Sequence, residues 1–268
     1  MTQRRLVVLL IVLAAAVPYL PTLDDYFVQD DFGVVGLLST KPAGYFPRWF
    51  VSTWMDDIWG YTPDEVRPFT AITYQIAALW RPESPVSNHA INIAFHAINA
   101  LLVLGVAEVA AGLALGPAAF AAIVFAVMPM QTESVAWITG RVDSMPACFY
   151  FAAFLLYARW RAVPRQSLYL WAVAAYFVAL FTKQNTVTLP AALVLYDAIV
   201  ARRPVRVTWS WLRPYAPFVL LTVGFLALRY MLFGEVAREG TINDERVRLF
   251  LADLSIHLLP HTSRPDPP

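Results

Sequence analysis

The chain has 268 residues, of which 59% are hydrophobic and 15% charged, and its formal net charge is +1. A soluble domain of this length needs more polar surface to cover its core, so the composition excludes an ordinary soluble protein and indicates one that faces lipid. The near-neutral charge gives no basic field for nucleic acid, and the single cysteine, Cys148, excludes an intrachain disulfide.

Seven apolar runs follow one another, near residues 6–23, 89–112, 113–129, 145–158, 167–182, 186–200 and 214–233. A helix needs about 20 residues to cross the hydrocarbon, so the shorter runs require tilt or apolar flanks. We expect an all-α integral membrane protein with about seven transmembrane helices. Residues 1–235 would form this multispan domain, and residues 236–268 an exoplasmic segment with a disordered or truncated tail.

The first run follows Arg4 and Arg5 and could be a cleaved signal peptide. It continues to Leu23, which favours a retained anchor. The connections at 159–165 and 202–213 also carry arginines and no acid, so the positive-inside rule places them and the N-terminus in the cytoplasm. We expect a multi-pass protein of the bacterial inner (plasma) membrane.

The segment 24–88 is the least apolar part of the membrane domain. We expect it to be a large first exoplasmic loop, with short amphipathic helices on the bilayer surface. Asp30 and Asp31 stand a few residues beyond the first helix. Two adjacent carboxylates at a membrane exit can act as a general base or hold a cation; the alternative is a solvated helix cap.

The second apolar run carries a polar stripe within an arc of roughly 80°, formed by His89, Asn92, His96 and Asn99. These side chains would line an external site, or they would hydrogen-bond neighbouring helices. The two histidines lack a third evident ligand, which argues against zinc.

A short outer connection at 131–143 holds Glu133, Arg141 and Asp143. An arginine can bind phosphate with its bidentate fork, and Gly140 gives the backbone room to turn. The alternative is an internal ion pair that stabilises the loop.

Lys183 lies between two apolar runs, next to Gln184. An ionisable residue at such depth is costly and is a functional candidate by default. Its ammonium suits an anionic lipid headgroup, whereas the alternative is a side chain that snorkels at a helix end. Arg67 and Arg229 are weaker candidates of the same kind.

This series of features resembles the GT-C superfamily of polyprenyl-phosphate-sugar glycosyltransferases, and most closely the transmembrane and tetratricopeptide-repeat O-mannosyltransferases. The matching pieces are Asp30-Asp31-Phe32, Arg67-Pro68-Phe69-Thr70, Asn88 to Asn92 with His96, Pro129 to Asp143, Thr182-Lys183-Gln184, Tyr196-Asp197 and Leu228-Arg229. Met128 and Gln131 stand where the family has histidines, and no tetratricopeptide repeats follow. We therefore expect a C-terminally truncated member.

The resemblance implies an inverting transfer of a mannose-like sugar from a polyprenyl phosphate to a protein or glycan hydroxyl, on the exoplasmic or periplasmic face. It implies that Asp30 or Asp31 takes the hydroxyl proton. The cations that would stabilise the leaving phosphate are Arg141, Lys183 and Arg229. The second acidic motif, which would orient the acceptor or hold Arg141, is Glu133 and Asp143.

Further residues that would line the site are Arg67, His89, Asn92, His96 and Gln184. The resemblance identifies no certain cofactor, and whether the acidic loops hold Mg²⁺ or Mn²⁺ is left open. A transporter should show two related halves with broken helices, and the sequence has no such symmetry. A seven-helix receptor would place its N-terminus outside. An inactive scaffold, or a fragment of a larger transferase, is the other alternative.

Overall fold

The computed structural model describes residues 3–55, 65–81, 84–202 and 208–234. Every regular element in these ranges is helical, which confirms the all-α prediction. The chain divides into two compact units, residues 1–225 and 226–268. The predicted exoplasmic segment and tail at 236–268 lie outside the described residues, as does part of the predicted first loop.

The α-helices of at least ten residues are α1 (Gln3–Ala16), α2 (Asp31–Thr40), α3 (Pro68–Trp80), α4 (Pro85–Val109), α5 (Leu115–Val127), α7 (Arg141–Ala162), α8 (Gln166–Leu180) and α11 (Ala216–Phe233). The shorter elements are η1 (Val17–Asp24), η2 (Ala43–Phe50), η3 (Pro129–Gln131), α6 (Thr132–Ala136), η4 (Gln184–Thr188), α9 (Leu189–Leu195), the π-helical turn η5 (Tyr196–Val200) and α10 (Trp209–Leu212).

Three described stretches are long and apolar enough to cross a membrane, namely Gln3–Asp24, Pro85–Val109 and Ala216–Phe233. A fourth is the pair Leu115–Val127 and Pro129–Ala136, which is bent by 52°, if it counts as one span. These spans support a multi-pass membrane protein. The count of seven stays a prediction, because it requires α7, α8 and the α9–η5 segment to cross as well.

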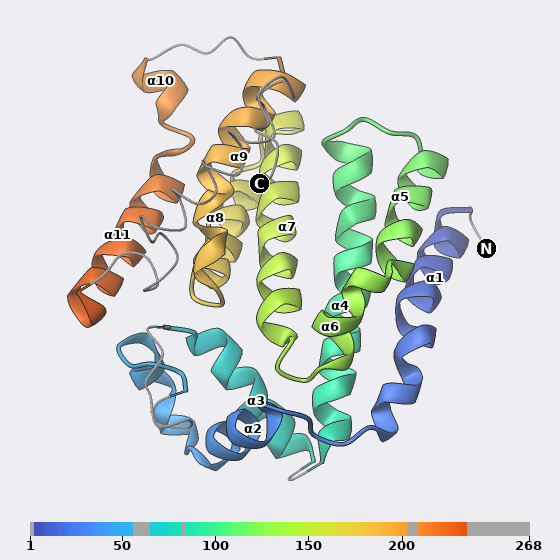
Figure 1. The fold of residues 1–268 in the computed structure, drawn as a ribbon. Helices are drawn as coiled ribbons and strands as arrows, with labels where there is room; N and C mark the ends of the chain where they lie inside the picture. Colours follow the sequence, from blue (N-terminus) through green and yellow to red (C-terminus); the bar gives the residue numbers. More distant parts are fainter. Residues whose placement is uncertain (1–2, 56–64, 82–83, 203–207, 235–268) are drawn as a thin grey trace, which may run out of the picture. The chain divides into compact units, whose positions relative to one another are not determined.

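Helices α1, α4 and α5 pack side by side (Figure 1) through a seam rich in small residues. The fully buried alanines of this seam are Ala15, Ala100, Ala118, Ala122 and Ala126. Lipid offers no hydrophobic drive for helices to associate, so membrane helices gain stability from the close approach that small side chains permit. The alanine-rich sequence of the first three apolar runs therefore produces this three-helix contact.

Elements α2, η2 and α3 lie at one end of the helices of the first unit (Figure 1), which we call the α2–α3 end. Their core contains Trp49, Trp54 and Tyr74, and it includes Ile138 from the loop before α7. The ring of Phe50 also lies 5.1 Å from that of Phe181, just beyond α8. Trp49 and Trp54, from the segment expected to lie on the bilayer surface, are therefore buried in this core.

Candidate functional site

Asp31 is the first residue of α2 and is fully buried. Its Oδ1 accepts hydrogen bonds from the backbone N–H (2.8 Å) and the hydroxyl (2.7 Å) of Thr139, and its Oδ2 accepts one from the Val28 N–H (3.1 Å). The carboxylate thus ties α2 to the loop before α7. Asp30 is half-exposed and forms no side-chain cap. The structure separates the two adjacent aspartates into one anchored and one accessible group.

Arg141 begins α7 and is fully buried, with its guanidinium 4.4 Å from the ring centre of Tyr74. Its Nε donates to Asn92 Oδ1 (2.8 Å) and its Nη1 to Thr73 Oγ1 (2.9 Å). Its Nη2 donates to the backbone oxygen and to Oδ1 of Asn88, both at 2.9 Å. Burial raises the pKa of Tyr74 to about 12, so this ring stays neutral. The guanidinium fork is therefore occupied by neutral protein groups.

This arrangement bears on the two roles expected of Arg141. A lipid phosphate would have to displace several of these hydrogen bonds before it could bind the fork. The geometry favours the structural alternative, in which Arg141 stabilises the loop at the start of α7. The stabilising partners are neutral acceptors rather than the acids of an ion pair.

The four side chains of the polar stripe on α4 are all buried, and they are His89, Asn92, His96 and Asn99. Three of them hydrogen-bond backbone carbonyls of neighbouring segments, at Trp137 (2.8 Å), Ala126 (2.9 Å) and Ser144 (2.8 Å). The stripe therefore joins α4 to α5, to α7 and to the loop before α7. This geometry favours the interhelical alternative over direct contact with a substrate.

Lys183 and Asp143 form an ion pair at the α2–α3 end. Lys183 precedes η4, Asp143 lies in the first turn of α7, and their side chains are 24% and 54% exposed. Nearby, the hydroxyl of Thr70 on α3 donates to the backbone oxygen of Thr182 at 3.3 Å. The resemblance implied that Asp143 would orient the acceptor or hold Arg141; its ion-pair partner in the structure is Lys183.

A cavity of about 220 Å³ opens beside this ion pair. Its lining residues come from the first turns of α7 and from η4, and they are Asp143, Pro146, Ala147, Tyr150, Phe151, Asn185, Thr186 and Thr188. Asp143 belongs to both the ion pair and the cavity wall. The candidate site therefore contains an amphiphilic hollow next to a half-exposed cation.

Other predicted site residues are not part of this grouping. Glu133 is exposed in the first turn of α6. Arg67 is buried and forms an ion pair with Glu65 (2.8 Å). Gln184 opens η4 and is half-buried. Arg229 lies in the second unit, 5.5 Å from the ring of Phe233, so its predicted contact with the leaving phosphate stays a prediction.

Metal binding is a separate question at this end. Within the described ranges, the histidine, cysteine, aspartate and glutamate side chains form no group of three that could hold a metal ion. The described residues therefore give no support for Mg²⁺ or Mn²⁺ between the acidic loops.

Gly140 permits the tight loop before α7. A Cβ at this position would lie 2.3 Å from the backbone oxygen of Glu133 and 3.0 Å from that of Trp137. Its φ of −57° is ordinary for any residue, so close backbone approach, rather than an unusual torsion, requires glycine here.

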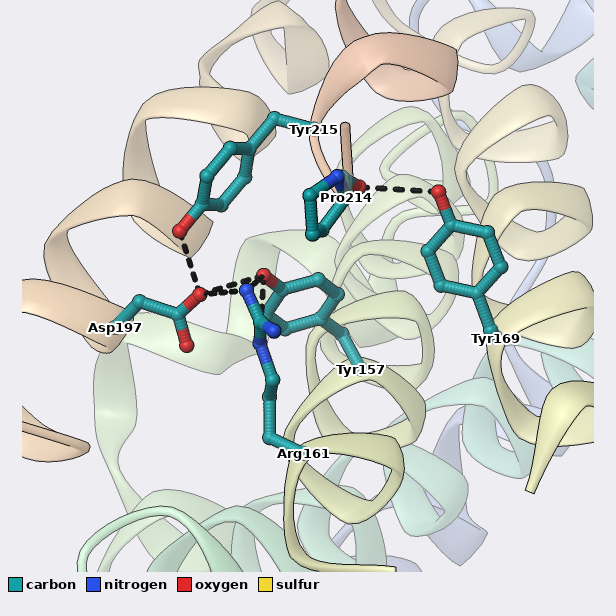
Figure 2. A network of polar contacts seen from close by, with 6 residues as sticks. All are labelled: Tyr157, Arg161, Tyr169, Asp197, Pro214 and Tyr215. Carbon is teal, nitrogen blue, oxygen red and sulfur yellow. Dashed lines mark hydrogen bonds and ion pairs between the residues drawn. The ribbon is translucent and has the colours of Figure 1, made fainter. Parts of the chain in front are cut away.

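A second polar network lies at the other end of α7 (Figure 2). Oδ2 of the fully buried Asp197 accepts hydrogen bonds from the hydroxyls of Tyr157 (2.7 Å) and Tyr215 (2.5 Å), and it pairs with Arg161. We did not predict this network from the residues. Its signal was an acid within an apolar run, together with Tyr157 and Arg161 one helical turn apart.

Comparison with known proteins relates the chain to protein O-mannosyl-transferases. It is 30% identical over 205 residues to protein O-mannosyl-transferase TMTC3 of Mus musculus, and 28% identical over 216 residues to TMTC4 of Homo sapiens. It is 32% identical over 152 residues to Tmtc1 of Drosophila melanogaster.

The matches with these three proteins cover 73%, 69% and 54% of this chain, and 22%, 28% and 17% of the relatives. The chain therefore spans less than a third of the length of each. No family model matches the chain, and no solved structure matches it.

Proposed function

We propose, from the membership of this chain in the family of TMTC protein O-mannosyl-transferases, that its membrane helices carry a glycosyltransferase site at the α2–α3 end. The site would move a mannose-like sugar from a polyprenyl phosphate to a protein hydroxyl. The observation that supports it most is the Asp31–Thr139 contact, 2.7 Å long. It holds the Asp30 segment beside the loop that leads into Asp143 and its partner Lys183.

Asp30 is the base in this proposal. Asp31 is buried and its oxygens already accept three hydrogen bonds, so it serves as a positioning residue. Asp30 is the accessible carboxylate of the pair. It would take the proton from the acceptor hydroxyl while the hydroxyl oxygen bonds to the anomeric carbon. A positioned base of this kind contributes about 10²–10⁴ to the rate.

Lys183 is the cation for the leaving group. The bond between the anomeric carbon and the phosphate oxygen breaks as the new bond forms, so negative charge grows on the phosphate. A fixed ammonium stabilises that charge in the transition state. Lys183 is half-buried and its partner Asp143 is more exposed, so a lipid phosphate could reach the ammonium from the side of the cavity.

The location of the site relative to the membrane is also part of the proposal. The arginines of 159–165 and 202–213 favour a cytoplasmic N-terminus by the positive-inside rule. The α2–α3 end would then face the exoplasm, where polyprenyl-linked sugar would meet a translocated protein. The bacterial inner membrane stays a prediction.

The test uses the full chain purified into lipid nanodiscs, with radiolabelled polyprenyl-phosphate mannose and a serine- and threonine-rich peptide as acceptor. We expect label on the peptide with the native chain and at least a 100-fold loss with Asp30→Asn. Asp24→Asn, an exposed carboxylate at the end of η1, is the matched control and should retain activity.

Two outcomes would count against the proposal. Equal activity of the native chain and the Asp30→Asn variant would remove the base. Donor binding without any transfer by the native chain would favour the alternative of an inactive scaffold or fragment.

A further inference from the structure

The cavity beside the Lys183–Asp143 pair has a defined direction along α7. Ala147 follows Asp143 by four residues, and Tyr150 and Phe151 follow Ala147 by three and four, so the four residues lie on one face of the helix and all line the cavity. Eight residues of α-helix rise by about 12 Å. The cavity therefore runs from the charged pair toward the apolar middle of α7.

The lining combines polar groups with an apolar wall. The carboxylate of Asp143 accepts hydrogen bonds, the amide of Asn185 donates and accepts them, and the hydroxyl of Tyr150 can do both. The hydroxyl of Thr188 donates toward Tyr150 Oη at 3.4 Å, which leaves the phenolic hydrogen for another acceptor. Pro146 and Phe151 add apolar carbons to the same lining.

This composition fits a sugar ring. A hexose presents hydroxyl groups around its edge and C–H groups on its faces, so it needs donors and acceptors next to an apolar surface. The volume of about 220 Å³ is below the roughly 300–1,000 Å³ of pockets that take drug-sized ligands. The cavity therefore suits one ring rather than an oligosaccharide.

We propose that this cavity binds the hexosyl group of the donor while Lys183 holds the adjoining phosphate; the inference rests on the proposed function. One oxygen of Asp143 receives Lys183, and the other oxygen is the acceptor for a sugar hydroxyl. Asp143 thus contacts both Lys183, which binds the phosphate, and a hydroxyl group of the sugar ring. Asn185 and Tyr150 complete the recognition of the hydroxyls.

The test measures equilibrium binding of two lipids to the full chain in nanodiscs. One lipid is polyprenyl phosphate and the other is polyprenyl-phosphate mannose of the same chain length. The native protein should bind the sugar-bearing lipid more tightly. Asn185→Ala and Tyr150→Phe should each weaken binding of the sugar-bearing lipid about 3- to 10-fold, as expected for a lost neutral hydrogen bond. Both variants should bind the sugar-free lipid as the native chain does.

Two controls separate the sugar from the phosphate and from general damage. Lys183→Ala should weaken the binding of both lipids. Tyr169→Phe removes a phenolic hydroxyl that donates to the Pro214 backbone oxygen at 3.1 Å, away from the cavity, and should change neither.

The outcomes distinguish this inference from the function on which it rests. An unchanged preference for the sugar-bearing lipid in both cavity variants would overturn the sugar site. An equal loss for the two lipids would overturn it as well, because it would place the phosphate or the prenyl chain in the cavity. Binding of neither lipid by the native chain would instead refute the proposed donor, and the inference with it.

Discussion

At the residue scale, Asp30 and Asp31 show how neighbours acquire different roles. Successive residues at the start of a helix point about 100° apart. One side chain can therefore enter the protein while the next faces outward. Asp31 enters and is buried, whereas Asp30 is half-exposed. The sequence identified the pair but could not rank its members, because the ranking depends on Thr139, which is distant along the chain.

Replacing Asp31 by alanine should destabilise the protein more than the same change at Asp30. Asp31→Ala leaves the Thr139 N–H and hydroxyl, and the Val28 N–H, without their acceptor. We expect a loss of about 3 kcal/mol, against about 0.5 kcal/mol for Asp30→Ala. Thermal unfolding in detergent measures both. Similar losses for the two variants would mean that Asp31 is not an anchor.

Gly140 offers a second residue-scale prediction. An added methyl group would meet the Glu133 backbone oxygen at 2.3 Å, and backbone cannot move aside as a flexible side chain can. We expect Gly140→Ala to cost about 1–3 kcal/mol. Gly116→Ala is the matched control, since a Cβ added there would have nothing within 4 Å; its unfolding midpoint should stay level or rise slightly. No difference between the two glycines would contradict the close approach.

At the element scale, α7 connects two polar networks of different character. Its first turn carries the partly exposed Asp143–Lys183 pair, and its last turns carry Tyr157 and Arg161 in the buried Asp197 network. An exposed ion pair contributes little to stability. A buried carboxylate with several donors is costly to break, because its partners lose their acceptor.

Asp197→Ala should therefore be far more damaging than Asp143→Ala. We expect a loss of about 3–5 kcal/mol for the buried acid and at most about 1 kcal/mol for the exposed one. The readout is the unfolding midpoint, together with the fraction of folded protein recovered after purification. A loss at Asp197 as small as the loss at Asp143 would show that the network of Figure 2 does not hold α7, η5 and Tyr215 together.

The elements also show what the sequence could predict. Periodicity located the polar stripe on α4, and the structure places all four side chains on its buried face. The same periodicity could not decide whether these side chains line a substrate site or bond to neighbouring helices, because the answer depends on backbone carbonyl groups of other segments. The sequence did not predict the Lys183–Asp143 ion pair either. Its members lie 40 residues apart and meet because α7 and α8 pack together.

At the scale of the whole molecule, hydropathy predicts seven apolar runs, whereas three or four stretches among the described residues are long and apolar enough to cross a membrane. The shorter runs differ because α8 has 15 residues and α9 has 7. Such helices cross a bilayer only with tilt or local thinning. The number of spans therefore depends on how the short helices pack against neighbouring helices, which the apolar runs alone do not show.

Reporter fusions test the arrangement in the membrane. A reporter after residue 75, in α3, and one after residue 208, before α10, should lie on opposite sides. We expect the first outside and the second inside. A cytoplasmic result at position 75 would place the α2–α3 end on the wrong side for a translocated acceptor.

The most direct measurement is photo-crosslinking of the full chain with a polyprenyl-phosphate sugar whose ring carries a photoreactive group, followed by peptide mapping. If the first turns of α7 and η4 form the donor site, labelled peptides will fall within residues 143–151 and 183–188. Excess unlabelled donor will abolish the label. Label concentrated within 157–169, 197–202 or 208–215, at the opposite end of α7, would contradict a transferase site at the α2–α3 end.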